Sequence, residues 1–274
     1  GMNVHGIIGH EFFNHFVVKV DYDRKLITVY DPEVYRPRRR DTAIPFSIEQ
    51  GRPYIAVTVI QDDDTKINAK LLIDSGASHG LMLETDTKEE ISLPDKNLST
   101  IIGWGLGGEL AGHLGRIKAL KIKSFMFKDV LVSFAEDYSD PEATRVTGRN
   151  GSIGGDVLSR FTTTFDYPGN TLYLRKNRAY RYPFEYNLSG IDLVASGRGY
   201  DSFRIIHVIG NSPAWHAGIR NGDIILVING KLSSDVSLSE INTLLRSRPG
   251  TKINLTINRD AEIMRVSFRL RRLI

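Results

Sequence analysis

The feature that most constrains this chain is an apolar run that ends in an aspartate and a turn of small residues. Leu71, Leu72 and Ile73 precede Asp74, and Ser75–Ser78 follow it. Aliphatic residues bounded by turn-forming residues are typical of a buried strand. A carboxylate at the end of such a strand has to be hydrogen-bonded or paired, because burying an unpaired charge is costly. Asp74 is therefore the first candidate for an acid-base group.

This run resembles the active-site loop of the aspartic proteases, in particular the retropepsin-like branch, in which hydrophobic residues precede Asp-Ser/Thr-Gly-Ala. The resemblance implies that Asp74 is catalytic. It also implies an active-site loop made of Ser75, Gly76, Ala77 and Ser78. On the motif alone, a strand that ends in an ordinary capped turn is the alternative, because short motifs also match by chance.

Two further segments fit the same resemblance. In retropepsin-like folds a hydrophobic residue followed by glycine, and then a short helix, packs beside the catalytic loop, and Ile153-Gly154 with Val157-Leu158 matches this element. A glycine-rich stretch between aliphatic residues is typical of a hairpin, which in the family is the flap over the substrate. The flap residues expected here are Gly103, Trp104, Gly105, Leu106, Gly107 and Gly108.

The N-terminal segment repeats the segment that follows the proposed flap. Gly6–Phe13 aligns without a gap with Gly151–Leu158, and the match continues from Asp21-Tyr22 onto Asp166-Tyr167. Internal repeats change the expected architecture. We interpret residues 3–32 as the end of a first protease lobe, whose larger part is expected upstream of residue 3. A chance resemblance between two strand-helix-strand segments is the alternative.

An aspartic protease needs two catalytic carboxylates, and the chain holds one Asp-Ser-Gly-Ala sequence. The partner aspartate is expected from the missing first lobe, or from a second copy of the chain by two-fold symmetry, as in homodimeric retropepsins. The expected domains are a first-lobe remnant at residues 3–32, a linker at 33–45, a retropepsin-like lobe at 46–178 and a further domain at 185–274.

The C-terminal region resembles a bacterial PDZ domain. Ser212–Gly230 carries the Ser-Pro-Ala, Ala-Gly-Ile, Gly-Asp-Ile and Ile-Asn-Gly elements of that family, and Ser237–Glu240 is a capping box that begins a helix. PDZ domains bind an extended peptide at a strand edge by β-augmentation. We expect the strand Phe203–Ile209 to form that edge, and the groove residues to be Gly199, Tyr200, Phe203, Ile205, Ile241 and Leu245.

Composition excludes several classes of protein. The absence of cysteine excludes disulfides and thiolate sites, and no apolar run has the length of a membrane span. The net charge of +4 is small, and the basic run Arg36–Arg40 is best interpreted as a solvated linker, so no nucleic-acid partner is expected. His10 and His15 are one residue too far apart for a shared zinc-binding helix face, and Asp62–Asp64 lacks the glycine and glutamate of a calcium loop. No metal or cofactor is expected.

These observations predict a mainly β protein, with a retropepsin-like acid-protease β-barrel lobe and a C-terminal α+β PDZ domain. The resemblance implies a bacterial aspartic endopeptidase that acts on peptides or proteins, exported to the periplasm or cell envelope, with a peptide ligand for the PDZ domain. Gly1-Met2 is typical of an expression vector, so no signal peptide is expected in the residues present. The alternative is a non-catalytic peptide-binding protein with a vestigial protease fold.

Overall fold

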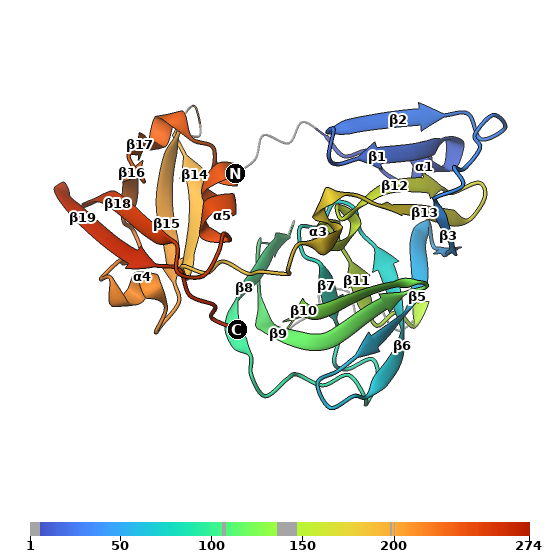
Figure 1. Cartoon of the computed structure of the whole chain (residues 1–274), viewed down its shortest axis with the longest axis horizontal. Coiled ribbons are helices and arrows are strands. Elements are labelled where there is room, and N and C mark those ends of the chain that lie inside the picture. The colour runs from blue at the N-terminus through green and yellow to red at the C-terminus, as the bar shows by residue number, and fades with distance from the viewer. Residues whose placement is uncertain (1–5, 106–107, 136–146, 198, 200) are drawn as a thin grey trace. The chain divides into compact units, whose positions relative to one another are not determined.

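The structure, a computed structural model, describes residues 6–105, 108–135, 147–197, 199 and 201–274. The described chain divides into two units, Gly6–Phe184 and Glu185–Ile274 (Figure 1). Each unit has its own hydrophobic core. Within the described ranges, no helix combines the length and the apolar character needed to cross a membrane.

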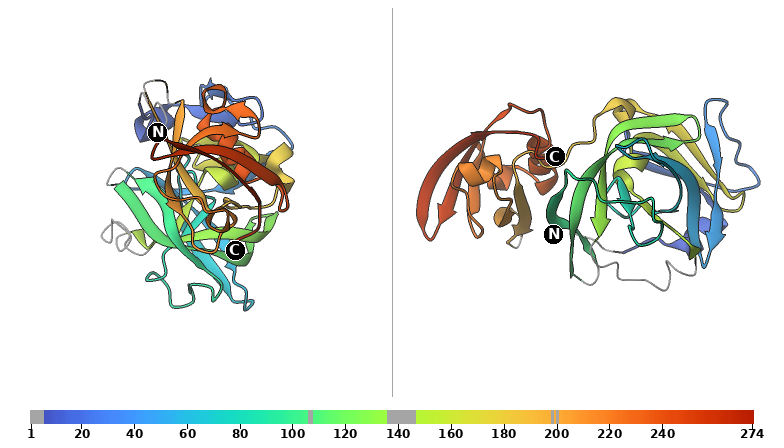
Figure 2. Two further views of the ribbon diagram at one scale, coloured as in Figure 1. Left: turned by 90° about the vertical axis from the view of Figure 1, so that its left-hand side faces the viewer. Right: turned by 90° about the horizontal axis from the view of Figure 1, so that it is seen from below.

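The first unit is built around an eight-stranded sheet in the order β4-β5-β6-β11-β7-β10-β9-β8. An additional pairing of β5 with β9 closes the sheet into a barrel, whose strands curve around a common core (Figure 2). The burial of β6 alternates residue by residue, as expected for a strand with one face in the core. The strands are β4 (Ser47–Glu49), β5 (Arg52–Ile60), β6 (Lys66–Ile73), β7 (Leu81–Leu83), β8 (Leu98–Gly105), β9 (Gly108–Ile122), β10 (Phe125–Ala135) and β11 (Gly151–Ile153).

A second, five-stranded sheet in the first unit has the order β2-β1-β12-β13-β3. Its strands are β1 (Val17–Asp21), β2 (Leu26–Tyr30), β3 (Thr42–Pro45), β12 (Phe161–Asp166) and β13 (Thr171–Lys176). The helical elements beside it are α1 (His10–His15), α3 (Gly155–Leu158) and the 3₁₀ turn η1 (Arg178–Arg181). The expectation of a plain linker at 33–45 is wrong in its last part, because β3 pairs with β13.

The structure confirms the internal repeat. α1 and α3 begin after Gly9 and Gly154, whose backbone angles are nearly equal, with φ of −105° and −112°. The hairpin turns that follow place Lys25 and Asn170, which are equivalent in the repeat, in the left-handed region with φ of 53° and 48°. Both copies therefore fold as a helical turn followed by a hairpin. Whether residues 3–32 belong to a first lobe stays a prediction.

The second unit is a sheet in the order β14-β15-β16-β18-β19, with β17 paired to β16. Its helix α5 begins with the expected capping box between Ser237 and Glu240, and ends at Leu245. The elements are β14 (Ile191–Ser196), β15 (Ser202–Val208), α4 (Pro213–His216), β16 (Ile224–Ile228), β17 (Lys231–Leu232), η2 (Ser233–Asp235), α5 (Leu238–Leu245), β18 (Lys252–Arg259) and β19 (Glu262–Arg269).

Candidate active site

Asp74 lies directly after β6, where the barrel strand turns into the small-residue loop. Its Oδ1 accepts hydrogen bonds from the backbone N–H groups of Gly76 (3.0 Å) and Ala77 (3.1 Å). Its own N–H donates to the carbonyl of Ile153 (2.9 Å). Asp74 and Ala77 are half-buried, whereas Ser75, Gly76 and Ser78 are exposed. The loop thus orients the carboxylate through one oxygen and leaves the site partly open.

The strand β11 and the helix α3 support this loop through backbone contacts. β11 pairs in parallel with β6, so that Ile153 lies opposite Ile73. The first N–H groups of a helix have no partner within the helix, and here carbonyls of the Asp74 loop accept them. These bonds run from Gly154 to Gly80 (2.9 Å), from Gly155 to Ala77 (2.7 Å) and from Asp156 to His79 (3.2 Å). Ile153 and Gly154 are therefore brought together with the Asp74 loop.

Gly154 permits this approach because it has no Cβ. A Cβ at Gly154 would lie 2.3 Å from the carbonyl oxygen of His79, and a backbone atom cannot move aside by changing a rotamer. We expect Gly154→Ala to lower the free energy of unfolding of the first unit by about 1–3 kcal/mol, the usual cost of overpacking. Urea unfolding measures the change, and hydrogen exchange in the second unit is the internal control. An unchanged midpoint would contradict this account of the loop.

His79 is a residue of the site that the sequence did not single out. Its Nε2 lies 2.8 Å from the hydroxyl of Ser152, a buried residue of β11, so the side chain links the Asp74 loop to the supporting strand. Burial lowers the pKa of the His79 imidazole, and the negative charge of Asp74 partly opposes this effect. The neutral imidazole is therefore the form that the folded protein favours.

This pKa shift predicts a loss of stability on acidification. Below the ordinary histidine value of 6.5 the unfolded chain binds a proton at His79 that the folded chain still rejects, so folding weakens as the pH falls. In His79→Gln this loss is absent, while a hydrogen bond to Ser152 can still form. We therefore expect the free energy of unfolding of the wild type to fall relative to that of the variant between pH 7 and pH 5. Urea unfolding of both proteins at each pH measures this difference. A difference that stays constant or moves the other way would contradict this account of the His79 titration.

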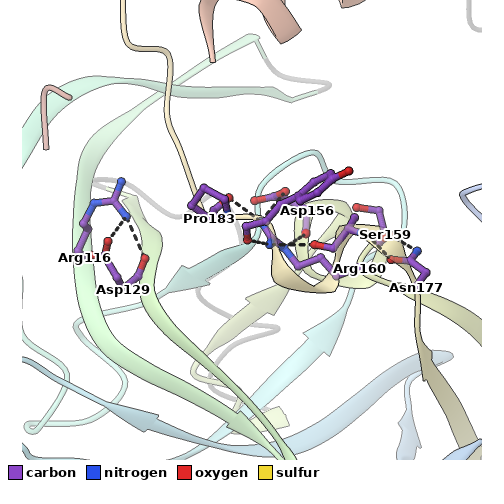
Figure 3. A network of polar contacts seen from close by, with 9 residues as sticks. Arg116, Asp129, Asp156, Ser159, Arg160, Asn177 and Pro183 are labelled. Atoms are coloured by element: carbon purple, nitrogen blue, oxygen red, sulfur yellow. Dashed lines mark hydrogen bonds and ion pairs between the residues drawn. The ribbon is translucent and has the colours of Figure 1, made fainter. Parts of the chain in front are cut away.

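The buried guanidinium of Arg160 fastens α3 to the chain that leaves the first unit. Its Nε donates to the carbonyl of Asp156 (2.8 Å), and its terminal nitrogens donate to the carbonyls of Tyr182 and Pro183 (3.2 Å for Pro183), as Figure 3 shows. The guanidinium also lies 3.5 Å from the centre of the Phe184 ring. These contacts hold the helix that carries the supporting N–H groups.

The glycine-rich stretch forms the expected hairpin. β8 and β9 are antiparallel, and Gly105 lies opposite Gly108. Gly103, Trp104 and Gly105 belong to β8, and Gly108 begins β9, whereas Leu106 and Gly107 lie outside the described residues. The role of this hairpin as a flap stays a prediction.

β15 is not the free sheet edge that the sequence predicted. β15, the expected groove edge, is paired with β14 on one side and β16 on the other. Four of the expected groove residues are core residues with at most 1% of their surface exposed: Phe203, Ile205, Ile241 and Leu245. Gly199 lies just before β15, and Tyr200 lies outside the described residues. The expectation that β15 is a free edge was wrong because β14 pairs with it; in the described sheet, the two strands at the edges are β14 and β19.

The described residues contain no cluster of three or more His, Cys, Asp or Glu side chains that could hold a metal ion. His10 and His15 instead contact groups of their own helix. The His10 Nε2 lies 2.8 Å from the Asn14 amide, and the His15 Nδ1 lies 2.7 Å from the carbonyl of Glu11.

Two family models match this chain. The aspartyl protease model covers residues 56–157, a range that includes the Asp74 loop, the β8–β9 hairpin and Gly154. The PDZ domain model covers residues 205–259, from β15 to the end of β18.

Individual proteins also match parts of this chain. The carboxy-terminal processing protease CtpA of Bacillus subtilis (strain 168) is 40% identical over 55 residues, which are 20% of this chain and only 12% of that relative. A retropepsin-like aspartic protease from Rickettsia conorii is 20% identical, with 49% of this chain and 98% of that chain covered and a TM-score of 0.35. A PDZ domain protein from Parabacteroides distasonis is 30% identical over 29% of this chain and 19% of that chain, with a TM-score of 0.26. By these two family matches, the chain contains an aspartyl protease domain followed by a PDZ domain.

Proposed function

We propose that the first unit belongs to an aspartic endopeptidase in which Asp74 supplies one of the two catalytic carboxylates. The observation that carries this proposal is the arrangement of Asp74 itself. The carboxylate stands at the end of a barrel strand and is held by the N–H groups of Gly76 and Ala77, while the backbone N–H of Asp74 donates to the carbonyl of Ile153. It is also partly exposed, so a water molecule and a peptide can reach it.

The chemistry explains why one carboxylate is not enough. In aspartic proteases two carboxylates share one proton across a water molecule, because like charges so close together cannot both ionise. The ionised carboxylate accepts a proton from the attacking water, and the protonated one donates a hydrogen bond to the peptide carbonyl. Asp74 can take either role. A second aspartate must come from outside the described loop, from an upstream lobe or from a second copy of the chain.

The PDZ domain implies binding of a peptide ligand. We propose that the peptide adds to β14 rather than to β15, since β14 is one of the two edge strands of the described sheet and is the one that contacts α5 (Figure 1). A ligand strand at β14 would satisfy its outward backbone groups. The ligand could be a segment of the protease substrate or a different chain end.

The alternative function is peptide binding without catalysis, with Asp74 as a remnant. Incubating the protein, expressed from its natural start, with a mixed peptide library at acid and neutral pH separates the two. Pepstatin-sensitive cleavage products support the endopeptidase, whereas peptides that are retained but never cleaved support the binding protein.

A further inference from the structure

The first copy of the repeat exposes apolar residues that the second copy buries. In the first copy Ile8 is 65% exposed, Phe16 39%, Ile27 61% and Val29 42%. Their repeat equivalents are at most 1% exposed: Ile153, Phe161, Leu172 and Leu174. In the second copy the barrel covers these positions. Apolar side chains that are exposed in one copy and buried in the other indicate a place where a partner packs.

The glycines of the two copies show the same contrast. A Cβ at Gly151 would lie 2.0 Å from the carbonyl oxygen of Met82, and one at Gly154 would lie 2.3 Å from that of His79. At the equivalent Gly6 and Gly9, a Cβ would meet nothing within 4 Å. Glycine weakens a chain entropically unless its lack of a side chain is used. The first copy therefore has the shape that receives a loop like residues 77–80, although no described residue occupies that place.

The sheet edge next to this surface is also uncovered. In the second copy β13 is covered by β3, with Leu172 opposite Ile44. In the first copy the equivalent strand β2 pairs with β1 and, among the described strands, has no partner on its other side. A long edge strand with exposed aliphatic side chains is unfavourable in a free protein, because it invites pairing.

The pairing between the two copies is symmetric. Lys19 lies opposite Thr164, which is its own repeat equivalent. Val18 lies opposite Phe165, the equivalent of Val20, and Val20 lies opposite Thr163, the equivalent of Val18. A register of this kind is self-complementary and defines a local two-fold axis between Lys19 and Thr164. This axis maps the barrel that covers β13 onto the empty surface over β2.

We propose that residues upstream of Gly1 in the natural protein form a second barrel that docks on α1, β1 and β2. This barrel adds a strand to the outer edge of β2 and buries Ile8, Phe16 and Ile27. Its catalytic aspartate donates its backbone N–H to the carbonyl of Ile8, as Asp74 does to Ile153. Only the role of that aspartate rests on the proposed function; the docking rests on the repeat and the reversed burial.

A second copy of this chain is a poorer occupant. Its barrel already covers its own α3, β12 and β13, as the burial of Leu158, Phe161 and Leu172 shows. The same barrel surface is therefore not free to cover α1 and β2 of a neighbour in the equivalent way. An upstream barrel of about the size of residues 46–153 has no such conflict.

The test compares two glycine variants in two lengths of the protein. In the present chain, Gly9→Ala has open space and an ordinary extended backbone, so its unfolding midpoint should equal that of wild type. In the protein expressed from its natural start, the same methyl group would meet the docked loop, and peptidase activity should fall roughly 100-fold, as misplaced catalytic groups cause. Gly154→Ala is the matched control, because it clashes in both lengths.

A second measurement does not depend on activity. Amide hydrogen exchange at residues 26–29 should slow at least about tenfold in the longer protein, because the added strand protects the outer edge of β2. Protection without any peptidase activity would support the docking and reject the proposed function. Peptidase activity with unprotected β2 amides and a silent Gly9→Ala would reject the docking and keep the function. The proposal would also be overturned if the natural protein started at or near Gly1. The same holds if the 274-residue chain formed a dimer that Gly9→Ala disrupts.

Discussion

Replacing Asp74 with asparagine is expected to reduce kcat/KM of the protein expressed from its natural start by roughly 10³-fold, within the range that general acid-base groups contribute. The physical reason is that asparagine keeps an oxygen that can accept the hydrogen bonds of the Gly76 and Ala77 N–H groups, but it can neither accept the proton of the attacking water nor share one with a partner. The fold should remain intact while activity falls. Cleavage of an identified library peptide, together with urea unfolding, measures both.

The matched control is Asp62→Asn, which makes the same chemical change at an exposed aspartate of the β5–β6 turn. Its activity is expected to stay within a few-fold of wild type. If Asp74→Asn retained activity within a few-fold of wild type, the aspartic-protease assignment would fail. If Asp74→Asn lost activity together with several kcal/mol of stability, the carboxylate would be structural, and the loss would say nothing about catalysis.

The sequence predicted those parts of the fold that arise within short stretches of the chain. The alternation along β6, the Asp74 turn, the capping box of α5 and the repeat of residues 6–29 are all visible in short stretches, and the structure contains each of them. The resemblance to retropepsin-like folds also predicted where Ile153 and Gly154 would pack. Their contact with the loop follows from the need of α3 to satisfy its first N–H groups.

The PDZ groove was misplaced for a physical reason. β15 carries the strong strand pattern, but which strand lies at a sheet edge depends on pairing between segments, and β14, which precedes β15 in the sequence, pairs with it as an antiparallel hairpin. His79 and Arg160 were missed similarly. His79 contacts Ser152 from 73 residues away in the sequence, and Arg160 gains its role from carbonyls 22 and 23 residues downstream. No single-sequence periodicity reports such contacts.

The same limit applies to the buried ion pair of Glu84 and Arg149, which supports the largest stability prediction. The Arg149 Nε lies 3.2 Å from a Glu84 carboxylate oxygen, and the two side chains are only 3% and 2% exposed. Glu84 follows β7 and Arg149 precedes β11, two strands that pair with each other. The ion pair therefore closes the end of the strand pair that positions Ile153 beneath Asp74.

Arg149→Met is expected to lower the free energy of unfolding of the first unit by about 3–5 kcal/mol, because the Glu84 carboxylate then stays buried without the guanidinium that compensates its charge. Urea unfolding measures this loss. The double variant Glu84→Leu/Arg149→Met should be much less destabilised than the sum of the single variants, because apolar residues of similar volume can replace a buried pair at little cost. A single-variant cost below about 1 kcal/mol, or strictly additive costs, would show that the two charges do not depend on each other. If the two charges do depend on each other, Arg149→Met should also weaken the pairing of β11. Hydrogen exchange at Gly151–Ile153 should then accelerate more than exchange in the second unit.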